Sequence, residues 1–283
     1  MAERIQTSLV AICLLLSAER AHSADMTECL RKARVLPAAI QTIDYQYGMD
    51  GVPNIKRFVI EGDHWYYGVA NSKNELPTQE FAFDGNRYQQ KIAGEFLSFS
   101  DANLLPLGQV EIHPILIPYT WFREDSKMLT LHDLHDQQRW SSVIERMTLE
   151  GTEDVDGRAC EVYRIEYPNR KVTVSFSVAD QGYPIRVRSE YSAGRTSELK
   201  VTELAAFPGP AIVGLRLLGS NTRVQQHFWI ERDNLLVNKR VDQSIFSLDP
   251  TDVVEIIDID EMKRTNERLR SDAVPAVIMQ SLK

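Results

Sequence analysis

The densest group of potential metal ligands in the sequence is His132-Asp133-Leu134-His135-Asp136. The two histidines stand three positions apart, so on a helix they would share one face and could bind a metal ion together. A catalytic zinc site needs a third ligand, which His64 or His113 would have to bring through folding. If residues 128–134 form a strand instead, the histidines point to opposite faces. We interpret the stretch as a polar loop leading into a helix, and expect no bound metal.

Signatures of the common catalytic sites are missing from the sequence. It contains no Gly-x-Ser-x-Gly, no phosphate-binding loop, no dinucleotide-binding glycine pattern and no Cys-x-x-Cys. Asp63, His64 and Asp84 fall on expected turns, where backbone chemistry explains the aspartates. We therefore expect a protein that is not an enzyme, with no catalytic residues and no cofactor.

The first 23 residues have the layout of a secretory signal peptide. Arg4 precedes the apolar run LVAICLLL (9–16), and small residues at Ala21 and Ser23 stand before a cleavage site ahead of Ala24. Eight apolar residues are too few to span a bilayer, and no other stretch is long and apolar enough. We expect an exported protein of the periplasm or cell envelope, without a transmembrane span.

Charge and cysteine content narrow the possible partners. The chain of 283 residues has a net charge of −8 and no basic block, which argues against binding to nucleic acid or to an anionic membrane surface.

After cleavage of the signal peptide, Cys29 and Cys160 are the only cysteines that remain. In an oxidising compartment they could form a disulfide, or they could be two separate buried thiols. The sequence leaves both possibilities open.

Alternation of apolar and polar residues predicts strands along most of the chain after residue 40. In 172–178, for example, the valines and Phe176 share one face while threonine and serines share the other. Such strands belong to an antiparallel sheet with one solvated side. The predicted strands and hairpins cover 55–70, 80–92, 160–167, 172–178, 184–191, 198–207, 215–219, 223–231, 235–246 and 253–258.

Helical signals are few and short. Residues 27–43 begin with a Thr27 cap, 136–147 begin with Asp136, and the charged stretch 258–271 predicts a surface helix. Prolines break 100–120 into loop or lid material. These helices cannot cover every apolar strand face. We therefore predict a mainly β fold: one domain over 24–283, with a single strongly curved antiparallel sheet (a half-barrel), two or three short helices and a C-terminal helix.

Aromatic side chains gather on two consecutive predicted hairpins and in the proline-rich stretch. Apolar, aromatic-lined hollows are the surfaces that hydrophobic ligands use, although any one of these rings could equally belong to an ordinary core. The predicted ligand-binding residues are Trp65, Tyr67, Phe81, Phe83, Trp121, Phe176 and Val187.

The second half of the chain resembles the lipoprotein carriers of the LolA/LolB type, including outer-membrane lipoprotein-sorting proteins. The resemblance lies in VDGRACEVYRIEYP (155–168), VSFSVADQGYPIRVRSEY (174–191), ELKVTEL (198–204) and VNKRVDQSIFSLDPTDVVEIID (237–258). It implies a half-barrel sheet whose concave apolar face, lidded by helices, takes up acyl chains. The chain departs from a minimal carrier by extra material around 100–150, and the family's lid-holding arginine matches no position here.

Two functions follow as hypotheses. The first is an exported, non-enzymatic protein that binds a lipid or an acylated, lipoprotein-type ligand in the concave face of the sheet. The alternative is a structural or sensory envelope module without a bound ligand, which recognises a protein partner through a sheet edge or the aromatic hairpins.

Overall fold

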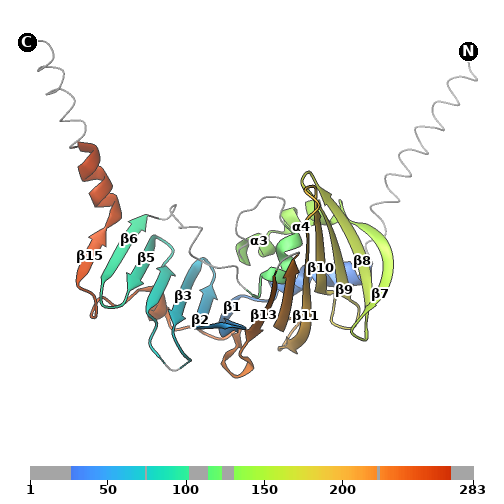
Figure 1. Ribbon diagram of the computed structural model, residues 1–283, viewed down its shortest axis with the longest axis horizontal. Coiled ribbons are helices and arrows are strands. Elements are labelled where there is room, and N and C mark those ends of the chain that lie inside the picture. Colours follow the sequence, from blue (N-terminus) through green and yellow to red (C-terminus); the bar gives the residue numbers. More distant parts are fainter. Residues whose placement is uncertain (1–26, 74, 102–113, 123–130, 222–223, 269–283) are drawn as a thin grey trace, which may run out of the picture.

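The computed structural model describes residues 27–73, 75–101, 114–122, 131–221 and 224–268 (Figure 1). The predicted signal peptide, residues 1–23, lies outside this range. Of the predicted C-terminal helix, residues 259–268 are helical. No helix in the described ranges is long and apolar enough to cross a membrane.

One continuous curved sheet runs through the molecule, in the order β15-β6-β5-β4-β3-β2-β1-β13-β12-β11-β10-β9-β8-β7, with β14 paired to β1 beside this path. Neighbouring strands are antiparallel, except that β15 is parallel to β6. The predicted mainly β class with a single curved, open sheet is confirmed. The strands are β1 (Thr42–Met49), β2 (Val52–Glu61), β3 (His64–Ala70), β4 (Gln79–Phe83), β5 (Arg87–Ile92), β6 (Phe96–Asp101), β7 (Thr148–Val155), β8 (Arg158–Tyr167), β9 (Arg170–Ser177), β10 (Tyr183–Tyr191), β11 (Thr196–Ala206), β12 (Ile212–Asn221), β13 (Gln225–Ile230), β14 (Leu236–Val237) and β15 (Glu255–Asp258).

The two hairpins predicted over 55–70 and 80–92 form as β2–β3 and β4–β5. Each turn contains a glycine with positive φ, Gly62 at 58° and Gly85 at 89°. Residues with side chains rarely adopt this backbone conformation, so the glycines permit these tight reversals.

The helices are short, and α2 and α4 are capped as the sequence predicts. They are α2 (Glu28–Ala38), α3 (Leu131–His135) and α4 (Gln137–Ile144), with a 3₁₀ helix η1 (Ile117–Phe122). The prediction of a polar loop before α4 was wrong, because α3 occupies residues 131–135. The Thr27 hydroxyl accepts a hydrogen bond from the Leu30 N–H, and the Asp136 carboxylate accepts two at the start of α4. Helix α2 is shorter than predicted, because β1 begins at Thr42 and pairs there with Glu61.

The helices lie on the concave side of the sheet, over its second half. Helix α2 packs against β9 and β10, η1 packs against β10 and β11, and α3 packs against α2 and α4. Figure 1 shows α3 and α4 on that side beside β10 and β13. The main core lies between these helices and the inward faces of β8–β12, and it continues across the sheet to the inward faces of β1–β5.

The prediction of a strand over 235–246 was wrong beyond β14. Both edges of β1 are occupied, by β2 on one side and by β13 and β14 on the other, so the chain finds no free edge to extend. Residues 238–254, which we call the strap, cross the convex face instead. Its apolar side chains close a second, smaller core against that face, formed by Val59, Tyr66, Ala82, Leu97, Val241, Phe246 and Leu248.

Candidate functional site

A row of aromatic rings crosses the concave face from β1 to β5. Centroids of neighbouring rings lie 6.3, 6.2, 5.9 and 6.4 Å apart. Strand register explains most of the row, because directly opposed residues of an antiparallel pair face the same side. We call these residues the aromatic row: Tyr45, Phe58, Tyr67, Phe81 and Tyr88.

Four of the predicted ligand-binding residues lie together in or beside this row. Tyr67 opposes Phe81 and Trp65 opposes Phe83 across β3 and β4, and the Trp65 ring lies 5.9 Å from that of Tyr88. Tyr67 and Phe81 are buried, whereas Trp65 and Phe83 are half-buried. The sheet thus brings these four side chains onto one surface.

The prediction missed three members of the row, Tyr45, Phe58 and Tyr88. The signal was present in β1, where Ile43, Tyr45 and Tyr47 alternate with polar residues and are buried on the concave side. β1 also brings the inward-facing Lys56 of β2 into register with Tyr47, and the Lys56 ammonium lies 5.9 Å from the Tyr47 ring centroid.

The other three predicted residues lie in the half of the concave face that the helices cover. The Trp121 ring, on η1, lies 5.5 Å from the Phe176 ring and 5.6 Å from the Trp140 ring. Trp121 and Phe176 are fully buried, and Val187, opposite Val174, is also buried. Here the chain's own side chains pack against the sheet, so Trp121 and Phe176 are partners of one another in the core.

Three residues of the histidine-rich stretch, Asp133, His135 and Asp136, have structural contacts. His135, at the end of α3, has its Nε2 atom 3.1 and 3.0 Å from the carbonyl oxygens of Pro37 and Ile40, so it ties α3 to the end of α2. Asp133 pairs with Arg139 at 2.7 Å, and Asp136 caps α4. The described part of the chain contains no group of three or more histidine, cysteine or acidic residues that could hold a metal ion. His113 lies outside the described residues.

The two cysteines are free thiols and both are buried. The Cys29 Sγ atom, on the first turn of α2, lies 3.7 Å from the Phe176 carbonyl oxygen and 3.8 Å from that of Ser177. Ser177 is directly opposite Cys160 in the β8–β9 pair. Burial raises the pKa of Cys29 to about 12 and that of Cys160 to about 11. At neutral pH both are therefore unreactive thiols.

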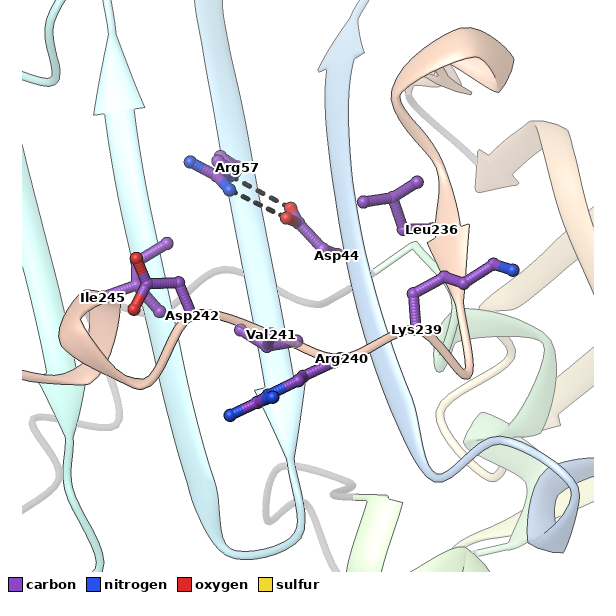
Figure 2. A pocket seen from close by; sticks show the side chains of 8 residues that line it. All are labelled: Asp44, Arg57, Leu236, Lys239, Arg240, Val241, Asp242 and Ile245. Atoms are coloured by element: carbon purple, nitrogen blue, oxygen red, sulfur yellow. Dashed lines mark hydrogen bonds and ion pairs between the residues drawn. The ribbon is translucent and has the colours of Figure 1, made fainter.

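The convex face carries two cavities beside the strap, of about 220 and 420 Å³. They share Arg57 and Ile245 as lining residues. Arg57 forms two hydrogen bonds with Asp44, at 3.0 and 2.7 Å. Figure 2 shows this pair facing across two strands, while the charged ends of Lys239 and Arg240 point away from it in different directions. The basic side chains thus do not converge on one point in the smaller cavity.

Comparison with known proteins gives likenesses of fold only. No family model and no curated protein matches the chain. Similar solved structures include a DUF1329 family protein from Desulfovibrio piger, with a TM-score of 0.47 and 10% identity over 78% of this chain and 98% of that one. A putative outer membrane lipoprotein-sorting protein domain from Vibrio parahaemolyticus has a TM-score of 0.44 and 13% identity over 77% and 95%. The lipoprotein LppX of Mycobacterium tuberculosis has a TM-score of 0.29 and 9% identity over 76% and 95%.

The resemblance to the LolA/LolB type is confirmed for the fold. The structure has the open curved sheet with short helices on its concave face that this resemblance implies. We transfer no function from these structures, because their identities to this chain and their TM-scores are low.

Proposed function

We propose that this protein is an exported, non-enzymatic protein that binds a lipid or an acylated ligand against the aromatic row on the β1–β5 half of its sheet. The observation that carries the proposal is the row itself, together with the adjoining Trp65 and Phe83. The helices α2 and η1 pack against β9, β10 and β11, whereas the row lies on β1–β5, where its side chains are buried as part of the main core. Large aromatic surfaces gain the most free energy when an apolar partner excludes water from them.

The composition of the row suits an apolar chain better than a charged or sugar-like ligand. Its five members present ring faces and edges, and the strands beneath them continue the apolar surface with Ile43, Ile60 and Val69. Hydrophobic ligands are held by contact area on such a surface, and a few polar groups then fix their orientation. Trp121, Phe176 and Val187 remain predicted contacts for a ligand long enough to reach the helix-covered half.

Binding of the apolar dye N-phenyl-1-naphthylamine to the full chain tests the proposal. We expect the dye to become fluorescent on binding, and a lipid extract or a fatty-acid methyl ester to displace it. Changing Trp65 and Phe83 to serine should lower dye affinity at least about fivefold, since each loses roughly 1.5–3 kcal/mol of apolar burial at most. Both side chains are only half-buried, so this double variant should fold.

A matched control is Val178→Ser, which removes an apolar side chain that is 51% exposed and distant from the row in strand order. It should bind the dye as the unchanged protein does, and circular dichroism should report the same sheet content for all three proteins. Absence of dye binding by the unchanged protein, or equal binding by the double variant, would contradict the proposal. Native mass spectrometry of protein purified from its source would identify the ligand.

A further inference from the structure

The aromatic row ends at β5 in a polar surface. In the β5–β6 pair, Tyr88 opposes Ser100 and Gln90 opposes Ser98. Because opposed residues face the same side of a sheet, a phenol, an amide and two hydroxyls lie together on the concave face. We call Tyr88, Gln90, Ser98 and Ser100 the polar end. Tyr88 belongs to both the row and the polar end, and thus joins them.

The phenol of Tyr88 is a hydrogen-bond donor without a partner among the residues that the structure describes. Its side chain is 5% exposed, and the buried hydroxyl forms no hydrogen bond with any described residue. Burial also raises the pKa of this phenol above its ordinary value, which keeps the hydroxyl protonated. A buried donor without a partner costs about 1–3 kcal/mol, so such groups in proteins usually have a reason to be retained.

The charged residues of β5 face the other way. Arg87 pairs with Asp258 at 2.9 Å and Lys91 pairs with Asp252 at 2.5 Å, and both lie on the convex side, as the alternation of the strand requires. The inward residues of β5 and β6 are thus uncharged. A carboxylate or phosphate placed there would lose its hydration without gaining a cation, which is unfavourable.

We propose that the polar end binds an uncharged hydrogen-bond acceptor, such as the ester or amide carbonyl of an acylated ligand, which accepts from the Tyr88 hydroxyl. The acyl chain then extends along the aromatic row toward β1, a distance of about 19 Å for four strand spacings. This inference rests on the proposed function, and adds to it the class of ligand and its orientation.

The test uses the full chain and compares two probes of equal carbon chain length, methyl dodecanoate and n-dodecane, each displacing N-phenyl-1-naphthylamine. In Tyr88→Phe, the affinity for methyl dodecanoate should fall about 3- to 10-fold, the range expected when one hydrogen bond is lost. The affinity for n-dodecane should not change. The variant should fold, because it removes a hydroxyl that has no hydrogen-bond partner in the described part of the chain.

Tyr66→Phe is the control, since it removes a phenol from the convex face, where Tyr66 donates to Glu80 at 2.9 Å. It should change neither affinity. If Tyr88→Phe lowers the affinity for both probes equally, or lowers neither affinity, the proposed orientation of the ligand is overturned while the proposed function stays intact. If neither probe binds the unchanged protein, the proposed function itself fails.

Discussion

Cys29 shows how one residue's environment decides its chemistry. It lies on the first turn of a helix, where an exposed thiol would be activated. Packing of α2 onto β9 removes water from this thiol, and the neighbouring Glu161 carboxylate and Cys160 raise its pKa further. Cys29 is therefore a protonated thiol at neutral pH. Both cysteines act as small apolar side chains of the core unless an oxidant joins them in a disulfide.

Alkylation of the two cysteines should therefore be slow in the folded protein. At pH 8, iodoacetamide should modify the peptides containing Cys29 and Cys160 only after a denaturant is added, as measured by mass spectrometry of each peptide. Rapid modification of both without denaturant would contradict the buried positions. A mass lower by two hydrogens in a cross-linked peptide would show a disulfide instead.

The same pKa shifts predict loss of stability in alkali. Folding raises the pKa of Cys29 from its ordinary value of 9.0 to about 12, so the folded state disfavours the thiolate. The burial of the thiol contributes fully below pH 9, and its contribution is lost as the pH rises toward 12. The free energy of unfolding in urea should fall above pH 9. Replacing both cysteines with alanine should reduce this fall, while other groups such as the buried tyrosines keep part of it.

At the scale of elements, the buried side chain of Gln89 is one of those that join the strap to the sheet. Gln89, on the convex face of β5, is 2% exposed. Its amide donates to the Phe246 carbonyl at 3.1 Å and accepts from the Leu248 N–H at 2.9 Å. The strap cannot join a strand edge, so the side chain satisfies the backbone groups that a sheet would otherwise satisfy.

Gln89→Ala should thus loosen the strap. Two buried backbone groups lose their partners, which should lower the free energy of unfolding by about 2–4 kcal/mol, and proteolysis should cut first within residues 238–254. Gln79→Ala, at an exposed position on β4, is the control and should change stability by less than about 0.5 kcal/mol. Equal stability of the two variants in urea unfolding would show that the strap does not depend on Gln89.

At the scale of the whole molecule, the docking of α2 on the sheet depends on a residue without a side chain. Gly182 has a φ of 77°, and a Cβ atom added there would lie 2.2 Å from the Cys29 carbonyl oxygen and 2.8 Å from the Ala33 nitrogen. Both are helix backbone atoms, which cannot move aside separately. The glycine therefore allows helix and turn to approach closely.

Gly182→Ala and Gly157→Ala form a matched pair. Gly157 has nearly the same φ, 79°, but nothing within 4 Å of an added Cβ. Gly157→Ala should cost about 1–2 kcal/mol of unfolding free energy from backbone strain alone. Gly182→Ala should cost at least about 2 kcal/mol more, because α2 must shift. Thermal and urea unfolding measure both values, and equal losses would show that α2 tolerates displacement.

Short-range chemistry made much of this protein predictable from its sequence. Period-two alternation places Trp65, Tyr67, Phe81 and Phe83 on one side of two strands, and the turn glycines and the caps at Thr27 and Asp136 act within a few residues of themselves. These features depend on local backbone preferences and on burying one face, so the amino-acid order alone determines them.

Only the tertiary structure decided which half of the concave face the helices cover and where the strap lies. Three contacts join residues from 55 to 159 positions apart: Trp121 with Phe176, the hydrogen bonds of Gln89 to residues 246–248, and the close approach of Gly182 to α2. Such contacts depend on which sheet edges are already occupied and on which surfaces meet once the sheet has curved. Local periodicity contains no information on either point. For that reason residues 238–246, which we predicted as part of a strand, form part of the strap on the convex face instead.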